Sequence, residues 1–232
     1  MPTLFEPQAA MIAATSEGRG FPVRRIFCIG RNYAAHAREM GKDPEREAPF
    51  FFTKWAENVV PSGTVIAYPP GTRDFHYEGE LVIAIGKGGR NIAPADALAH
   101  VYGYAAGLDM TRRDLQFEAR EMGRPWDVAK NVEQSAPLGL IHPASAVGHL
   151  SAGRIALTVN GQVRQDGDLG EMIWNVAEVI AYVSRFYRLE PGDLIYSGTP
   201  AGVGAVVEGD EIIVTVEGLS DCVIRIGPEA DD

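Results

Sequence analysis

Two glutamates stand two positions apart at the start of a strongly apolar segment. Glu78 and Glu80 flank Gly79, and residues 81–85 are all apolar. Alternate residues of a strand point to the same face, so a strand here would place both carboxylates side by side. Like charges this close repel, and a cation would relieve the repulsion. A solvated strand face is the alternative, but the apolar run that follows is typical of a strand buried on both faces.

A third acid follows a second apolar segment. Asp109 comes directly after residues 104–108, which are typical of another buried strand. Alone it would be assigned to a turn before a helix. Together with Glu78 and Glu80 it predicts an all-oxygen site, which suits hard ions such as Mg²⁺, Mn²⁺ or Ca²⁺ better than zinc. Three protein ligands would leave positions for water or a chelating substrate, and His76 is expected beside this site.

A histidine and a glutamate are spaced to share one face of a predicted helix. His36 and Glu39 stand at positions i and i+3. A carboxylate beside an imidazole fixes the ring, and the pair can orient and deprotonate a water molecule. A solvated His–Glu pair on the helix surface is equally compatible with the spacing.

The glycine-rich segments do not match nucleotide-binding motifs. Residues 85–89 lack the spacing of a P-loop and predict a turn. Residues 197–204 are not followed by a helical pattern, so they predict a tight loop in which Thr199 lines a pocket. Lys130, taken alone, is compatible with an ordinary solvated lysine.

Short apolar segments predict the strands that must position these residues. Helices are expected from Asn32 to about Met40, from a Thr111 cap to Gly123, and over residues 171–187. Asn160-Gly161 predicts a hairpin turn. Because strands dominate and do not alternate with helices, the pattern predicts an α+β domain that is mainly β. The predicted strands are residues 24–29, 49–53, 79–85, 101–108, 155–159, 194–196, 211–217 and 221–226.

The composition of the 232-residue chain narrows its class. A formal net charge of −10 argues against a nucleic-acid partner. No apolar run is long enough to span a membrane, and no signal peptide is recognisable, so a cytoplasmic protein is expected. Cys28 and Cys222 lie in apolar segments and predict buried thiols. We expect an N-terminal arm or short leading helix over residues 1–20 and a single catalytic domain over residues 21–232.

Taken together, these segments resemble the fumarylacetoacetate hydrolase family from about Val23 to Ile226. Within the family, residues 111–116 and 123–127 are most similar to the members that cleave fumarylpyruvate. Two positions depart from the usual pattern, because Trp55 replaces a proline and Asn131-Val132-Glu133 replaces Gly-Phe-Asp. The motifs that carry the resemblance are Gly30-Arg31-Asn32-Tyr33 with His36, Phe52-Thr53-Lys54, Glu78-Gly79-Glu80-Leu81, residues 107–116, Lys130, Ser135-Ala136-Pro137 and Ser197-Gly198-Thr199-Pro200.

The resemblance implies a fold of packed, rolled mixed β-sheets with a few short helices, and a homodimer. It implies a divalent ion on Glu78, Glu80 and Asp109, and a water-activating dyad of His36 and Glu39. Lys130 would face the reacting oxygen. The residues that would hold the substrate are Lys54, Arg113, Gln116 and Thr199.

The implied activity is hydrolysis of a carbon–carbon bond in a 2,4-dioxo acid, with fumarylpyruvate and water giving fumarate and pyruvate in aromatic (gentisate) catabolism. The alternatives are an acylpyruvate hydrolase, an oxaloacetate-type decarboxylase or isomerase, and a non-catalytic metal-binding dimer. A substrate with a second carboxylate would need its own cation on a protein of this net charge. The candidates are Arg31, Lys54, Arg112 and Arg113.

Overall fold

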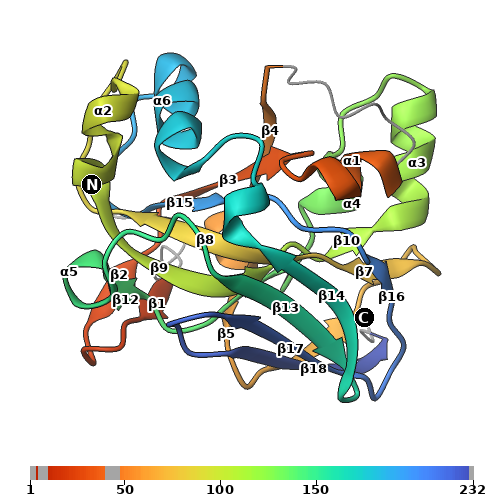
Figure 1. Cartoon of the computed structure of the whole chain (residues 1–232). Coiled ribbons are helices and arrows are strands. Elements are labelled where there is room, and N and C mark those ends of the chain that lie inside the picture. Colours follow the sequence, from red (N-terminus) through yellow and green to blue (C-terminus); the bar gives the residue numbers. More distant parts are fainter. Residues whose placement is uncertain (1–3, 5–9, 40–47, 230–232) are drawn as a thin grey trace.

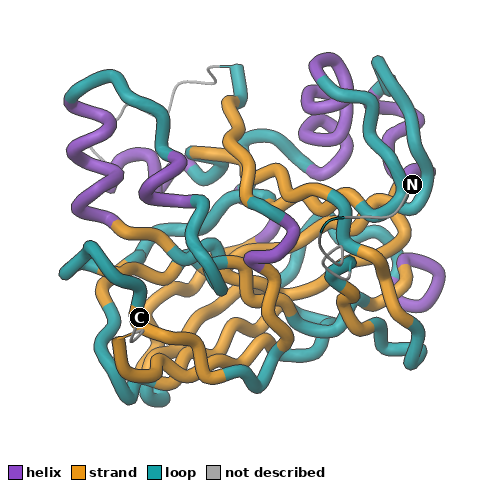
Figure 2. The backbone as a smooth tube through the Cα atoms, turned by 180° about the vertical axis from the view of Figure 1, so that it is seen from behind, coloured by secondary structure: helices purple, strands orange, loops and turns teal. Residues whose placement is uncertain are grey.

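The computed structural model describes residue 4, residues 10–39 and residues 48–229. Strands make up most of its ordered elements, and the helices are short. Figure 1 shows curled sheets stacked on one another, and Figure 2 shows the strands in the middle of the molecule with the longer helices toward its upper edge. The predicted α+β class, mainly β, is confirmed.

The largest sheet has eight strands and is centred on β8 (Gly79–Ile85), in which every residue is buried. β8 pairs antiparallel with β9 (Val101–Leu108) on one side and with β15 (Asp193–Tyr196) on the other. A strand covered on both faces needs apolar residues at successive positions, and only Glu80 interrupts that pattern. The remaining strands are β3 (Arg25–Gly30), β4 (Phe50–Lys54), β5 (Val59–Pro61), β11 (Ala136–Leu138) and β12 (His142–Pro143).

A five-stranded sheet covers one face of β8 and β9. The core between the two sheets includes Leu81 and Ile83 from the large sheet and Leu157 and Val214 from the smaller one. Its strands, in spatial order, are β14 (Gln162–Asp168), β13 (Arg154–Val159), β17 (Glu211–Val216), β18 (Cys222–Glu229) and β6 (Val65–Tyr68).

The turn between β13 and β14 is the hairpin that the sequence predicts. Asn160 and Gly161 have φ of 50° and 74°, as a turn with two positive φ angles requires.

A small three-stranded sheet leads into the acidic segment. β7 (Phe75–Tyr77) ends directly before Glu78 and lies between β10 (Thr111–Arg112) and β16 (Gly204–Ala205). The pairing of β7 with β10 fixes the chain on both sides of the acids, because β10 begins two residues after Asp109.

The described part of the N-terminal segment forms a hairpin and no helix. β1 (Ile12–Ala14) pairs antiparallel with β2 (Gly20–Pro22), and Thr15 bridges to Ile141. The leading helix that we considered for residues 1–20 is therefore wrong for residues 10–20. Residues 1–3 and 5–9 lie outside the described residues.

The helices gather in two groups above the large sheet (Figure 1). One group lies beside β4 and β10 and includes three short helices that reach the acids. The other group lies at the opposite end. The first group is α1 (Ala34–Glu39), α3 (Arg113–Glu121) and α4 (Asp127–Lys130), and the second is α2 (Pro94–Ala97) and α6 (Val176–Phe186). The remaining helical turns are α5 (Ala144–Val147), η1 (Ala56–Asn58), η2 (Leu98–His100) and η3 (Leu169–Glu171).

None of the described helices has the length and apolar character needed to cross a membrane.

The predicted helix caps at Asn32 and Thr111 are wrong. The Asn32 side chain donates to Trp174 O and Ser197 O, so it links distant segments. Thr111 lies in β10, and its hydroxyl donates to Asp109 O at 3.1 Å. At Asn32, tertiary partners compete successfully with local capping, whereas Thr111 bonds two residues back and lies in a strand paired with His76. The helix predicted over residues 171–187 begins only at Val176, and Met40 and Gly41 lie outside the described residues.

Shortening a side chain between the two sheets should destabilise the fold. Val214 is fully buried on β17, whereas Val163 on β14 is 56% exposed. Val214→Ala is expected to lower the free energy of unfolding by about 2 kcal/mol, because it removes buried methyl groups and leaves a cavity. Val163→Ala is the matched control and should change it by less than about 0.5 kcal/mol. Urea unfolding of both variants measures the difference, and equal losses would contradict the described packing of the sheets.

Candidate active site

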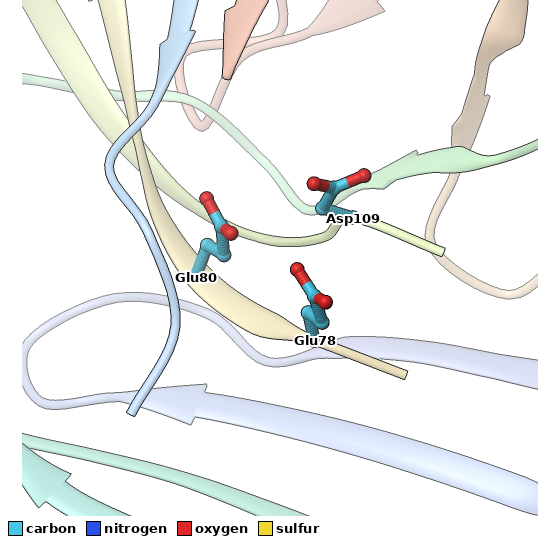
Figure 3. Close-up of side chains that lie close together, drawn as sticks. All are labelled: Glu78, Glu80 and Asp109. Atoms are coloured by element: carbon cyan, nitrogen blue, oxygen red, sulfur yellow. The ribbon is translucent and has the colours of Figure 1, made fainter. Parts of the chain in front are cut away.

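The pairing of β8 with β9 brings the three acids together. Gly79 stands opposite Leu108, and the Asp109 N–H donates to Glu78 O at 2.9 Å, so the ladder continues one step beyond both strands. The carboxylates of Glu78, Glu80 and Asp109 offer oxygens that all lie within 4.8 Å of one another. Figure 3 shows the three side chains converging on one space. Each residue is at most 5% exposed, so a solvated strand face is excluded.

Gly79 and Gln165 hold the strand at this point from its other face. A Cβ on Gly79 would lie 3.1 Å from Leu157 and 3.2 Å from Gln165 Oε1. The Gln165 side chain accepts from Gly79 N at 2.9 Å and donates to Thr199 Oγ1 at 2.7 Å. The second sheet therefore presses directly on the backbone between the two glutamates.

Two cations neutralise Glu78. Lys130 Nζ donates to Glu78 Oε2 and to Asp109 Oδ2, both at 2.8 Å. Arg113 donates to the other oxygen of Glu78 at 2.5 Å. Burial alone would raise the pKa of Glu78, but the charges of Lys130 and Arg113 outweigh it and hold the pKa below the usual value. Glu78 is therefore ionised at neutral pH.

Glu80 lacks such a partner. Its hydrogen bond comes from the backbone N–H of Gly198 at 2.8 Å, and it forms no ion pair with any residue that the structure describes. Burial raises the pKa of Glu80, and the charges of Asp109 and Glu78 raise it further. Oxygen Oδ1 of Asp109 is also buried without a hydrogen bond, although Lys54 Nζ lies 2.9 Å away.

These features fit a divalent cation. A buried carboxylate that is disfavoured as an anion, beside two more carboxylates, is stabilised when a positive charge is placed among them. All the candidate donors are oxygens, which suits hard ions that keep several open positions. Among the residues that the structure describes, Glu78, Glu80 and Asp109 thus form the cluster that could hold an ion.

The predicted His36–Glu39 pair is formed on α1. His36 Nδ1 lies 3.1 Å from Glu39 Oε2, and Glu39 also accepts from Gly202 N at 3.1 Å. The hydrogen bond with His36 lowers the pKa of Glu39 against the effect of burial, and Gly202 adds to the lowering. With Nδ1 donating to the carboxylate, His36 Nε2 is the nitrogen that can accept a proton. His36 is only 6% exposed, so it is not a solvated surface residue.

A pocket brings most of the predicted site residues to one place. The three acids, His36 and Lys130 line it together, which sequence spacing alone does not establish. Arg31, Arg113, Gln116 and Thr199 also reach it, as predicted for substrate-binding residues. The remaining lining residues are Ile29, Gly30, Phe50, Phe52, Phe117, Arg120 and Trp126.

Lys54 is the predicted substrate-binding residue that does not line the pocket. It is buried behind Asp109, where it donates to Met110 O at 3.1 Å and to Ser135 Oγ at 2.8 Å. It also donates to the backbone carbonyl of Lys130. These bonds favour a role in holding Asp109 and Lys130 in place over contact with a substrate.

The two departures from the family pattern are linked by a hydrogen bond. Asn131 Oδ1 accepts from the backbone N–H of Trp55 at 2.7 Å and from Asn58 Nδ2 at 2.7 Å. A proline at position 55 has no N–H to donate. Trp55 and Asn131 therefore satisfy each other's polar groups.

His76 lies beside the acids, as expected, and contacts Arg113. Its Nδ1 accepts from Arg113 Nε at 3.4 Å, and its Nε2 lies 2.8 Å from Asp74 Oδ1. Burial and the charge of Arg113 lower the pKa of His76, which favours the neutral ring that this pair of contacts needs.

Sequence reasoning missed several residues that shape the site. Asn32 bonds the loop at Ser197 to the segment at Trp174, and Gly198 packs so closely that its Cβ would lie 2.7 Å from Asn32 Cβ. No local pattern marks such long-range contacts. Arg120 and Phe117 could have been found, because they continue the α3 face of Arg113 and Gln116 at helical spacing.

The comparisons with known proteins agree with this geometry. The model of the family "Fumarylacetoacetate (FAA) hydrolase C-terminal" matches residues 25–227. A fumarylpyruvate hydrolase from a Ralstonia species is 52% identical over 80% of this chain and 96% of its own length. A mitochondrial oxaloacetate tautomerase from Rattus norvegicus is 41% identical over 84% of this chain and 88% of its own length.

A solved structure is similar over almost the whole chain. The crystal structure of fumarylpyruvate hydrolase from Pseudomonas aeruginosa in complex with Mn²⁺ and pyruvate superposes with a TM-score of 0.96 at 52% identity. The superposition covers 98% of this chain and 100% of the Pseudomonas aeruginosa chain. The resemblance seen in the motifs therefore extends to the fold, and the chain belongs to the fumarylacetoacetate hydrolase family.

Proposed function

We propose that this protein hydrolyses fumarylpyruvate to fumarate and pyruvate with a divalent ion, Mg²⁺ or Mn²⁺, held by Glu78, Glu80 and Asp109. The observation that carries the proposal is one pocket that unites this buried acidic cluster with His36. The fumarylpyruvate hydrolases from Ralstonia and Pseudomonas aeruginosa, the latter crystallised with Mn²⁺ and pyruvate, support it. The pathway would be aromatic catabolism.

The His36–Glu39 dyad on α1 activates the attacking water. His36 Nε2 takes one proton from the water while Glu39 holds Nδ1 and stabilises the imidazolium. The water oxygen adds to the 4-oxo carbon of the substrate. The bond from that carbon to the neighbouring methylene then breaks, and its electron pair moves toward the 2-oxo acid. The methylene carbon takes up the proton that His36 holds, which gives pyruvate and regenerates the neutral imidazole, and the 4-oxo carbon becomes a carboxyl group of fumarate.

Lys130 is placed to stabilise the negative charge that develops on the reacting oxygen. Burial lowers the pKa of Lys130, but Asp109 and Glu78 outweigh it and raise the pKa above the usual value, so the amine stays protonated. Two of its N–H groups point at Glu78 and Asp109, which leaves a third donor for the substrate. Such a donor is commonly worth about 3–4 kcal/mol in the transition state.

A divalent ion bound there would supply positive charge for the 2-oxo acid end of the substrate. On the pocket wall, Arg113 Nη1 donates to Gln116 Oε1 at 2.5 Å, and this pair would orient the 2-oxo acid end. Thr199 donates to Gly79 O at 2.9 Å and accepts from Gln165, so its hydroxyl is fixed at the pocket edge.

A second reaction on the same site is keto–enol conversion or decarboxylation of an oxaloacetate-like acid. The 41% identity to a mammalian oxaloacetate tautomerase favours this alternative over a non-catalytic metal-binding dimer. It needs proton transfer and a stabilised enolate but no attacking water. Assays of the purified protein with fumarylpyruvate, other acylpyruvates and oxaloacetate, each with Mg²⁺ or Mn²⁺, compare the reactions directly.

We also propose a cytoplasmic homodimer in which residues 21–232 form one catalytic domain after an N-terminal arm of residues 1–20. The two buried free thiols, Cys28 and Cys222, suit a reducing compartment. Analytical ultracentrifugation tests the dimer.

Activity should depend on the divalent ion and on its ligands. Glu80→Gln or Asp109→Asn is expected to lower kcat/KM by more than about a hundredfold, because even residues that merely orient metal ligands contribute 10–100-fold. Glu211→Gln is the matched control and should retain full activity, because Glu211 is a partly exposed acid that pairs with Arg225 outside the pocket. Pyruvate release is measured before and after chelator treatment. Full activity in protein shown by metal analysis to be free of the ion would contradict the assignment.

Removing the base should abolish hydrolysis but not binding of the chelating end. His36→Ala is expected to lower kcat by about 10²–10⁴-fold, the usual contribution of a general base. Affinity for oxalate, whose oxygens mimic the 2-oxo acid, should change less than threefold by calorimetry. His100→Ala serves as control, because His100 bonds to Lys87 O outside the pocket. A loss of oxalate affinity as large as the loss of rate would make His36 a binding residue.

A further inference from the structure

The pocket is lined by two arginines besides Arg113. Arg31 directly follows β3, and Arg120 lies in the last turn of α3. The two arginines therefore reach the pocket from segments that are far apart in the sequence. Arg31 is a predicted substrate-binding residue, whereas no motif of the sequence pointed to Arg120.

The other candidates for binding a far carboxylate lie at the inner end of the pocket or outside it. Arg113 donates to Glu78 and Gln116, and Lys130 donates to Glu78 and Asp109. Lys54 lies behind Asp109. Arg112 does not line the pocket, and it donates to Val128 O at 3.3 Å. Of the four candidates from the sequence, Arg31 and Arg113 line the pocket, and Arg113 lies at its inner end beside Glu78, so Arg31 is the candidate placed for the far end of a substrate.

Arg120 stands at the outer end of a graded helix face. Arg113, Gln116, Phe117 and Arg120 occupy positions i, i+3, i+4 and i+7 of α3, so they share one side of the helix. Arg113 and Gln116 are buried beside the acids, whereas Phe117 and Arg120 are exposed. The helix rises about 10 Å over these seven steps. A substrate whose 2-oxo acid end lies beside Glu78 would extend along this face of α3 toward Arg120.

Arg31 is held in place by an aromatic stack. Its guanidinium lies over the Phe50 ring at 5.1 Å, and Trp126 packs edge-on to Phe50 at 5.4 Å. Gly30 makes this possible, because a Cβ there would lie 2.1 Å from the Phe50 ring. Arg31 itself has φ of 55°, a strained value for an arginine that the surrounding contacts must maintain. Strain of this kind is frequent at ligand-binding positions.

We propose that Arg31 and Arg120 form an anion subsite that binds the carboxylate at the far end of the substrate and makes the enzyme selective for diacids. This inference rests on the proposed function, since it presupposes that the 2-oxo acid end binds at Glu78, Glu80 and Asp109. Guanidinium groups suit this task because each can donate two parallel hydrogen bonds to a carboxylate. The flat apolar walls of Phe50, Phe117 and Trp126 suit an extended unsaturated chain between the two ends.

The test compares two substrates that differ in one charge. Fumarylpyruvate and its methyl ester at the far carboxylate have the same chain, so the ratio of their kcat/KM values isolates the contribution of that charge. The ratio is measured for the unmodified protein, Arg31→Gln, Arg120→Gln and the double variant. Arg124→Gln is the matched control, because Arg124 is exposed, lies outside the pocket and pairs with Glu118. Arg120→Lys tests whether charge alone is sufficient.

We expect the unmodified protein and Arg124→Gln to favour the diacid at least about tenfold, which corresponds to 1.36 kcal/mol. Each glutamine variant should lose most of that preference because its kcat/KM for the diacid falls. Its kcat/KM for the ester should change less than twofold. The diacid preference of Arg120→Lys should lie between that of the unmodified protein and that of Arg120→Gln. Equal losses on both substrates, or an unchanged ratio in the double variant, would overturn the subsite.

The outcomes also separate this inference from the proposed function. Pyruvate release from both substrates at equal rates by the unmodified protein refutes the anion subsite and leaves the hydrolytic function standing. No pyruvate from either substrate, with Mg²⁺ or Mn²⁺ present, refutes the function and the subsite together. Unchanged melting temperatures of the variants establish that a lost preference is not caused by unfolding.

Discussion

Three carboxylates are buried within 4.8 Å of one another where β8 meets β9, and the rest of the structure must make that arrangement tolerable. Removing a charge from water costs several kcal/mol, and like charges at this distance add repulsion. Ion pairs with Lys130 and Arg113 stabilise the Glu78 carboxylate, and a hydrogen bond from the Gly198 N–H stabilises Glu80. The balance is incomplete at Glu80, which leaves the cluster a place for a cation.

The fold around the cluster follows from the need to fix it on both sides. The five-stranded sheet presses on Gly79, and Gln165 ties that glycine to Thr199. On the opposite side, Asn32 ties the segment after β3 to the loop that carries Gly198. The helix α1 starts two residues after Asn32, so the same side chain that anchors the loop also sets the position of His36. The acids, the loop and the dyad are thus one hydrogen-bonded unit.

The acidic cluster and the proposed anion subsite occupy different parts of the pocket. The acidic cluster lies where the central strands β8 and β9 of the large sheet meet, whereas the outer wall is made by α3, Phe50 and Trp126. Relatives with 52% and 41% identity carry the names of a fumarylpyruvate hydrolase and an oxaloacetate tautomerase. Changes on helices and loops alter an outer wall at little cost to the packed sheets.

Local sequence determined the strands, the mainly β class and the acids of the site. The apolar run at residues 81–85 and the alternation of side chains in a strand are short-range properties, so Glu78 and Glu80 were predictable as neighbours. The motifs also indicated His36, Glu39 and Lys130. Tertiary structure alone decided that Lys54 lies behind Asp109, that Asn32 bonds to distant partners instead of capping a helix, that Thr111 lies in a strand paired with His76, and that Arg120 reaches the pocket. Those outcomes depend on residues far apart in the chain, and the free energy of a buried contact is set by the partner that packing supplies, which local spacing does not contain.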